Sequence, residues 1–380
     1  GAATPAERAS PGAQPGASPA SRAPPPPAAP RAGRAAEQSL AKFAWLDLLA
    51  DNQRRAQLCD AIARRGYAVV EVPEAAAKEI SAMQDMAAEF FAMPQEDRRA
   101  LGRLRLYRDK VVGYRELGGG AASFLEVHAL AGGGVVPRPK RPPGFAAAAA
   151  ALHRTLQAMA LQVLEWLAAW VDVPPGALLQ SLDEGALGNL REGDCGSSVL
   201  RLCCYGGAAD GGEDVDQAGL DASGKGRVLF DEHTDASFLT IAPVGATAGL
   251  QFREASGGGP WADVENAFCG RPGHVIIFGG DMLEVLTCQR YAAAVHRVAK
   301  PTLQDAPGEV WRRVSMPFLV RGQPSAVLDT RRFLEEDPDA PLPRLESLDY
   351  ADLRRFLDLK GRRRFQGQRL LDTGVAPQGA

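Results

Sequence analysis

The second half of the chain is divided into short β-type runs by turn residues, and this pattern limits the folds that it can adopt. Between residues 198 and 320, runs rich in Val, Ile, Leu, Phe and Thr are separated by Gly, Pro and Asp. The runs are SVLRLCCYGG, RVLFDEHTDASFLTIAP, AGLQFREA, WADVENAF, GHVIIFGG, AAAVHRVAKP and EVWRRVSMPFLV. Strands that are so short and so closely spaced are typical of a β-sandwich or a jelly-roll barrel.

The first half of the chain is dominated by helical patterns. Leu58 and Ile62 share one face of a predicted helix that Gly66 ends, and the β-rich run YAVVEV follows. Two further helices are predicted, over AAAKEISAMQDMAAEFFAM, which stops at Pro94, and around residues 146–171. Charged and amide residues interrupt the last of these, so it is a helix with one buried face and not a membrane span. The predicted fold class is mainly β with flanking α.

Changes in composition suggest where the folded part begins and ends. Residues 1–38 are rich in Ala and Pro, and we expect this leader to be disordered. Its arginines and serines also suit the remains of an organelle transit peptide. We predict a helical N-terminal region at 39–175, a β core at 176–325, and a C-terminal helix and tail at 326–380, where DYADLRRFLDLK is amphipathic.

Charge and cysteine usage narrow the functional classes. The formal net charge is −3, and the sequence lacks the basic field that nucleic-acid binding requires. The cysteines are scattered without a CxxC pair, which in a chain of this size indicates reduced thiols. We therefore expect no nucleic-acid or membrane partner. The expected location is the cytoplasm, or a plastid or mitochondrion if the leader is a transit-peptide remnant.

The run FDEHTDASFLTI contains, just before its apolar part, a histidine and an aspartate that can bind a metal. Alternate residues of a strand share a face, so His233 and Asp235 are expected to point the same way, about 6–7 Å apart. An imidazole nitrogen and a carboxylate oxygen could then bind one ion. Because an ordinary strand with a polar beginning shows the same pattern, the interpretation requires a third ligand.

His296 offers the third ligand, because it interrupts the strand-like run YAAAVHRVAKP. Enough strands lie between Asp235 and His296 to bring the two side by side. Two histidines and a carboxylate form the facial triad of non-haem iron oxygenases, although zinc accepts the same ligand types. The other histidines have structural interpretations: His128 and His153 in helix or loop segments, and His274 at the start of an apolar strand.

The run RRVSMPFL offers a site for an organic acid. Arg313 and Ser315 alternate onto one face of a strand, where a guanidinium can grip a carboxylate bidentately and a hydroxyl can add a hydrogen bond. Tyr205, on the strand before the metal pair, offers another hydroxyl. A surface ion pair for Arg313 and a structural hydroxyl for Ser315 are the alternatives.

Taken in order, these motifs resemble a known family. H-x-D, then H-R-V, then R-x-S is the order of the 2-oxoglutarate- and Fe(II)-dependent dioxygenases of the isopenicillin N synthase-like type. Its core blocks look like EHTDASFLTI…AGLQF, GGDMLEVLTCQRYAAAVHRV and RRVSMPFL. Its N-terminal region looks like ARRGYAVVEV, AAEFFAMPQEDR and VVGYRE. The resemblance covers about residues 40–360.

The resemblance implies an enzyme with a double-stranded β-helix (jelly-roll) core. Its cofactors would be Fe(II), 2-oxoglutarate and O2, with ascorbate as a further candidate. The iron ligands, which are also the catalytic residues, would be His233, Asp235 and His296. Arg313 and Ser315 would bind the far carboxylate of 2-oxoglutarate, and Tyr205 would help to orient it. The reaction would hydroxylate or desaturate a small organic substrate with release of succinate and CO2.

The chain also departs from the family pattern. Cys203 stands where the family often has an asparagine, and Cys288-Gln289 stands where Asn-Gly is common. The segment 206–227 is longer than usual, which fits a disordered insertion or a lid over the site. It contains GLDASGKG, the frame of a phosphate-binding loop, but Gly226 replaces the Ser or Thr that would hold magnesium. This replacement argues against nucleotide binding.

Three other functions are compatible with the motifs. An iron-dependent oxidase of the same fold would not use 2-oxoglutarate, and a non-catalytic binding protein would keep only the scaffold. A zinc hydrolase is disfavoured because no glutamate sits beside the ligands as a general base. The primary substrate would be selected around the barrel mouth, where Phe124, His128 and Tyr114 are candidates. The sequence leaves the oligomeric state open.

Overall fold

The fold is taken from a computed structural model of the chain. The structure describes residues 42–107, 110–117, 122–173, 176, 178–182, 194–206, 226–253, 260–271, 273–287, 289–301, 311–322, 327–328 and 348–349. The predicted leader, most of the 206–227 insertion and the predicted C-terminal helix lie outside the described residues.

Helices form where apolar residues recur at helical spacing, and local capping residues set where a helix begins and ends. The side chain of Asp51 caps the second helix by accepting a hydrogen bond of 2.7 Å from the backbone N–H of Gln53, and Gly66 ends it with a φ of 87°. None of the described helices is long and apolar enough to cross a membrane. The helices are α1 Trp45–Ala50, α2 Asn52–Arg65, α3 Glu74–Ala92, α4 Gln95–Leu101, α5 Phe145–Trp170, α6 Asp281–Leu286 and the short 3-10 turn Leu179–Ser181.

The strands form a large sheet, a smaller sheet and one isolated pair. The large sheet has the order β1-β2-β12-β9-β15-β7-β5-β4-β3, with β14 also beside β7 and β6 beside β5. The smaller sheet has the order β11-β10-β13-β8, and β16 pairs with β17. The strands are β1 Lys42–Ala44, β2 Tyr67–Glu71, β3 Arg105–Tyr107, β4 Lys110–Leu117, β5 Ala122–Leu130, β6 Val135–Val136, β7 Cys195–Gly206, β8 Gly226–His233, β9 Leu239–Pro243, β10 Leu250–Phe252, β11 Ala262–Asp263, β12 His274–Gly279, β13 His296–Pro301, β14 Arg312–Ser315, β15 Phe318–Val320, β16 Val327–Leu328 and β17 Leu348–Asp349.

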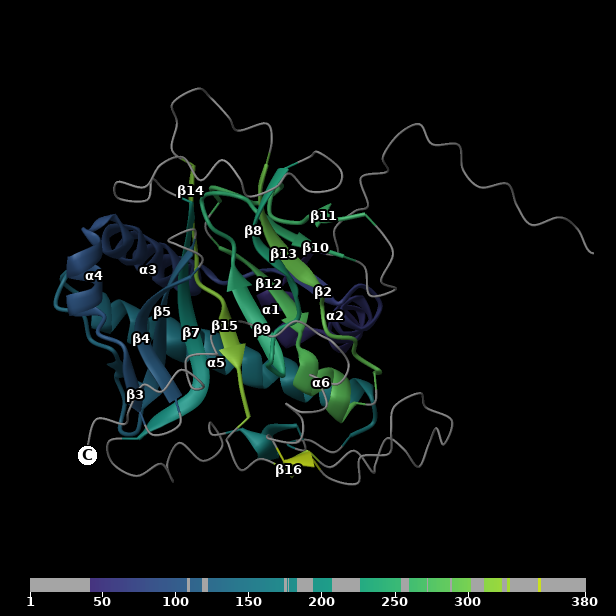
Figure 1. Cartoon of the computed structure of the whole chain (residues 1–380). Helices are drawn as coiled ribbons and strands as arrows, with labels where there is room; N and C mark the ends of the chain where they lie inside the picture. Colours follow the sequence, from purple (N-terminus) through teal and green to yellow (C-terminus); the bar gives the residue numbers. More distant parts are fainter. Residues whose placement is uncertain are drawn as a thin grey trace, which may run out of the picture. The chain divides into compact units, whose positions relative to one another are not determined.

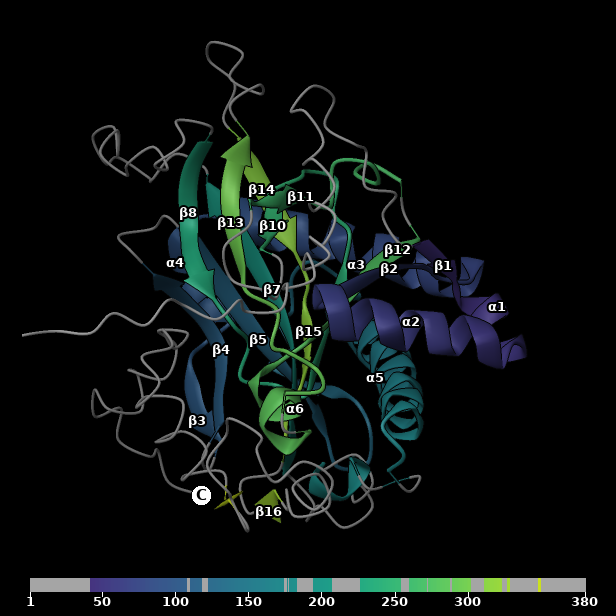
Figure 2. The same ribbon diagram turned by 90° about the vertical axis from the view of Figure 1, so that its right-hand side faces the viewer.

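The central strands of the large sheet are buried on both faces, and their residues alternate between two cores. On β12, Val275 and Ile277 join the core that the helices form, whereas Ile276 and Phe278 join the core between the two sheets. Helices α2, α3 and α5 cover the first face (Figures 1 and 2). The smaller sheet packs on the second face through residues such as Phe252. This arrangement confirms the predicted fold class, with two sheets stacked as in a jelly roll.

The N-terminal region contributes strands as well as helices. Strands β4 and β5 join the large sheet, and β5 pairs with β7, so the sheet is continuous across residue 175. His128 therefore lies on β5 and not in a helix or loop. The predicted run 309–320 also divides into β14 and β15, next to Pro317, which has no N–H to donate to a ladder. The predicted domain boundaries stay predictions.

A buried group of charges ties β4, β5 and β7 together on the face toward the smaller sheet. One oxygen of Glu126, Oε1, lies 2.7 Å from Nη2 of Arg115 and 2.9 Å from both Nε and Nη2 of Arg201. Burial raises the pKa of Glu126, but Arg201 and Arg115 more than offset this and hold it at about 2. The carboxylate therefore stays ionised inside the fold.

We expect Glu126→Gln to lower the free energy of unfolding by about 3–5 kcal/mol, because it leaves buried guanidinium groups without their carboxylate. The folded-state pKa is depressed, so the stabilisation is complete above about pH 4.5 and is lost as the pH falls toward about 2. Urea unfolding of both proteins from pH 7 to pH 3 should show the difference shrinking as the pH falls. Glu74→Gln removes an exposed partner of Lys78 and serves as the control with no measurable effect; equal stability of Glu126→Gln and the native protein at pH 7 would contradict the prediction.

Candidate metal centre

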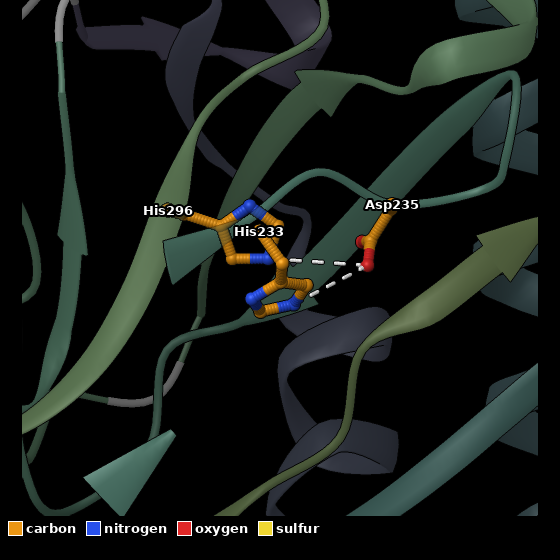
Figure 3. A group of neighbouring side chains, drawn as sticks. All are labelled: His233, Asp235 and His296. Carbon is orange, nitrogen blue, oxygen red and sulfur yellow. Dashed lines mark ion pairs between the residues drawn. The ribbon is translucent and has the colours of Figure 1, made fainter. Parts of the chain in front are cut away.

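Three side chains from two stretches of the chain come together between the two sheets. His233 ends β8, Asp235 follows it by two residues, and His296 begins β13 (Figure 3). Oδ1 of Asp235 lies 3.8 Å from Nε2 of His233 and 3.9 Å from Nε2 of His296. The three donor atoms lie within 4.8 Å of one another. The predicted metal-ligand set is thus brought to one point.

The path by which Asp235 reaches this point differs from the predicted one. Asp235 does not share a strand face with His233, because β8 ends at His233 and the chain turns. The backbone N–H of Asp281, at the start of α6, fixes the turn by donating to the carbonyl of Asp235 at 2.8 Å. A side chain at Gly280 would overlap the carbonyl groups of Asp235 and Ser237, so only glycine permits this approach.

Each histidine is oriented by its second ring nitrogen. Nδ1 of His233 donates to the carbonyl of Asp231 at 2.9 Å, and Nδ1 of His296 donates to the carbonyl of Ala294 at 2.9 Å. Both hydrogen bonds place the proton on Nδ1 and direct Nε2 toward Asp235. The same backbone arrangement, a carbonyl two residues earlier, therefore prepares both imidazoles as metal ligands.

The two carboxylate oxygens of Asp235 have different neighbours. Oδ2 accepts a hydrogen bond of 2.7 Å from the hydroxyl of Thr240, which lies 3.1 Å from the hydroxyl of Ser237. Oδ1 is left facing the histidines. Thr240 is fully buried on β9. Its role could not be predicted from the sequence, because a threonine in an apolar strand has no distinctive pattern.

The electrostatics of the group suit a divalent cation. Oδ1 of Asp235 lies 3.8 and 3.9 Å from the two histidine Nε2 atoms, which is too long for hydrogen bonds. The three candidate metal-ligand atoms therefore face one another without a shared proton. Burial and the neighbouring His296 lower the pKa of His233. Burial raises the pKa of Asp235, but the two histidines and Thr240 more than offset this, so it lies below its ordinary value. Neutral imidazole and ionised carboxylate are the forms that bind metals, and the residues therefore fit iron or zinc.

The predicted carboxylate-binding residues lie on two neighbouring strands of the large sheet. Arg313 and Ser315 on β14 pair with Tyr205 and Cys203 on β7. The Cζ atom of Arg313 lies 5.6 Å from the centre of the Tyr205 ring. Both Arg313 and Ser315 are buried, which excludes the alternative of a surface ion pair. The partner of Arg313 is the buried carboxylate of Glu265, which no pattern in the sequence pointed to.

The residues proposed to line a substrate space separate onto two faces. The ring of Phe124 lies 6.1 Å from that of Phe230, which contacts His233 at 4.7 Å between ring centres, so Phe124 is near the metal ligands. Tyr114 packs instead against Phe90 on the helix side, and this part of the prediction was wrong. The reason is the register of β4 and β5, which sets which alternate residues face the helices.

His128 lies on the same strand as Phe124 and two residues beyond Glu126. Its Nδ1 donates to the carbonyl of Gly196 at 2.9 Å. Burial lowers the pKa of His128 to about 4, so the ring is neutral near pH 7.

The departure from the family pattern at residue 289 is structural. Gln289 has a φ of 67°, a left-handed turn that suits the glycine common in the family. Cys288 lies outside the described residues.

Residues 197–322 match the family model for the 2OG-Fe(II) oxygenase superfamily. The chain carries a 2OG-Fe(II) oxygenase domain. The matched stretch contains all three candidate metal ligands as well as Tyr205 and Arg313. The predicted family is thereby confirmed, and the isopenicillin N synthase-like type is consistent with it. The family description also gives the predicted iron and 2-oxoglutarate as cofactor and co-substrate of this enzyme class.

Solved structures share the fold of this oxygenase. A 2OG-Fe(II) oxygenase family protein from Caulobacter crescentus is 22% identical with a TM-score of 0.62, over 85% of this chain and 99% of its own. A Neurospora crassa protein solved in complex with alpha-KG and thymine is 15% identical with a TM-score of 0.61, over 85% and 98%. The rice dioxygenase for auxin oxidation is 19% identical with a TM-score of 0.60, over 85% and 96%. No curated protein matches the chain.

Thr240→Val should weaken metal binding about tenfold or more, because it removes the hydroxyl that fixes Oδ2 of Asp235. An anaerobic Fe(II) titration measures the effect. Thr287→Val is the matched control, since Thr287 is equally buried but its hydroxyl donates to the carbonyl of Leu283. If both variants bind Fe(II) like the native protein, Thr240 does not position the carboxylate.

Proposed function

We propose that the oxygenase domain binds Fe(II) through His233, Asp235 and His296 and oxidises a small organic substrate with 2-oxoglutarate as co-substrate. The observation that carries this proposal is the convergence of two Nε2 atoms and one carboxylate oxygen within 4.8 Å. Zinc accepts the same donors, but the family match of the surrounding residues favours iron.

Bound iron, with O2 and 2-oxoglutarate, would supply the oxidising chemistry, and 2-oxoglutarate would leave as succinate and CO2. The chain itself supplies binding, orientation and a dry site. Arg313 would bind the far carboxylate of 2-oxoglutarate, with a hydrogen bond from the hydroxyl of Ser315, and the ring of Tyr205 would limit where the carboxylate lies. The rings of Phe278 and Phe252, 4.9 and 5.7 Å from that of His296, would exclude water from the metal ligands.

The proposed primary substrate is a small organic molecule that is hydroxylated or desaturated. Structural relatives support this size, since one is described with thymine and another as acting in auxin oxidation. On this chain the rings of Phe124 and Phe230 lie on one side of the metal ligands, and such rings would suit a substrate with a ring or another apolar body. We place the protein in the cytoplasm, or in a plastid or mitochondrion if residues 1–38 are the remnant of a transit peptide.

The first test is the formation of succinate from 2-oxoglutarate under air with Fe(II). We expect His233→Ala to abolish it, because one of three ligand atoms is lost. His274→Ala removes a buried histidine at the start of β12, outside the metal group, and should keep the native rate if it folds. Undiminished succinate formation by His233→Ala would contradict the assignment of the metal site.

A second measurement separates the proposed dioxygenase from an oxidase of the same fold. Uptake of O2 by the native protein should require 2-oxoglutarate. Equal uptake with and without it, retained in His274→Ala and lost in His233→Ala, would support the oxidase. A native protein that fails to bind Fe(II) in an anaerobic titration would instead be a binding protein on this scaffold.

A further inference from the structure

Arg313, the residue proposed to bind the co-substrate, already holds a carboxylate of the chain itself. Its Nη2 donates to Oε1 of Glu265 at 2.9 Å, and its Nε donates to Oε2 at 3.3 Å. Oε2 also accepts from the backbone N–H of Leu250 at 2.9 Å. The side chains of Arg313 and Glu265 are only 3% and 1% exposed, so water does not screen the pair.

The pair leaves one edge of the guanidinium for a second carboxylate. Glu265 uses Nε and one N–H of Nη2, and among the residues that the structure describes it is the one acceptor for Arg313. A guanidinium has five N–H groups, so Nη1 and the second N–H of Nη2 form another edge that can bind a carboxylate bidentately. Glu265 therefore does not block the edge of Arg313 that the co-substrate would use, and both carboxylates could bind the same guanidinium.

The position of the guanidinium is also fixed from other sides. A Cβ atom at Gly249 would lie 2.9 Å from Cδ of Arg313, so the side chain passes close to the backbone just before β10, where this glycine leaves room. The ring of Tyr205 lies 5.6 Å from Cζ. Arg313 is thus held in one place by contacts with Tyr205 on β7, with Gly249 just before β10 and with Glu265, two residues after β11. Among the described residues, Glu265 is its only charged contact.

The negative charge of Glu265 opposes the binding of a second carboxylate to Arg313. Burial lowers the pKa of Arg313, but the carboxylate of Glu265 more than offsets this, so the guanidinium stays charged and the pair is neutral as a whole. A second carboxylate that binds the open edge would find the charge of Arg313 already neutralised by Glu265. The carboxylate of Glu265 would also repel it across the guanidinium, and in a site without water this repulsion is weakly screened.

We propose that Glu265 sets the affinity of the oxygenase for 2-oxoglutarate, by holding Arg313 in position while its charge opposes the far carboxylate of the co-substrate. This inference rests on the proposed function. Glu265 is a positioning residue, since it acts through Arg313. The consequence is a site whose occupancy follows the supply of 2-oxoglutarate over a higher concentration range than Arg313 alone would give.

The test compares 2-oxoglutarate binding to the native protein and to Glu265→Gln. Glutamine keeps the shape and an oxygen that can accept from Leu250 or Arg313, but it removes the charge. With Mn(II) in place of Fe(II) and without O2, isothermal titration gives the Kd without turnover. We expect the Kd of 2-oxoglutarate to fall about tenfold or more, since a like charge in a buried site is removed. The Kd of 2-oxobutyrate, which has no far carboxylate, should not change.

Asp263→Asn is the matched control. It makes the same change of charge two residues earlier, at an exposed side chain that accepts from Gln251 and does not contact Arg313. Its Kd for 2-oxoglutarate should equal that of the native protein. A fall of similar size in Asp263→Asn would mean that general charge, and not Glu265, sets the affinity.

The inference is overturned if Glu265→Gln binds 2-oxoglutarate with the native Kd or more weakly. If Glu265→Gln does not fold, Glu265→Asp keeps the charge that the buried guanidinium needs and withdraws it by one methylene. The Kd should then fall by a smaller factor, and a rise would overturn the inference. Failure of the proposed function is a distinct result: the native protein with Mn(II) would not bind 2-oxoglutarate at all.

Discussion

The pairing of β8 with β13 is the interaction on which the site depends. His233 and His296 are opposite residues of this ladder, so the hydrogen bonds between two backbones set the distance between the imidazoles. A slip of one residue would turn one ring to the other face of the sheet. The ladder shifts register directly after this pair, between His296 and Val298. Irregularities of this kind re-aim side chains next to active sites, and here one lies where the ring positions matter most.

Residues whose role is encoded by local spacing could be predicted from the sequence. The alternation in R-x-S places Arg313 and Ser315 on one face, and β14 keeps that geometry. H-x-D identified the right residues through the wrong geometry, since Asp235 lies beyond the end of β8. Its position is set by Gly280 and Asp281, which are distant in the sequence, so the local pattern could identify the ligand but not its path.

Residues that act through long-range partners could not be predicted. Glu265 and Arg313 are 48 residues apart, and an isolated glutamate in ADVENAF gives no sign of a buried guanidinium nearby. The same limit applies to the strands of the N-terminal region. Tyr114 and Phe124 are both aromatic residues of short β-type runs, and only the register of β4 with β5 places one toward the helices and the other toward the metal ligands.

The two faces of the large sheet differ in chemistry, and this difference links stability to the site. The face toward the helices packs into the main apolar core, whereas the face toward the smaller sheet carries buried arginines. Such charges are tolerated only when carboxylates accompany them, as Glu126 accompanies Arg201 and Glu265 accompanies Arg313. Arg201 also contributes to the low pKa of Asp235. The buried ion pairs that stabilise this face therefore also reach the site: Arg201 acts on the metal ligand Asp235, and Glu265 acts on Arg313, the proposed co-substrate anchor.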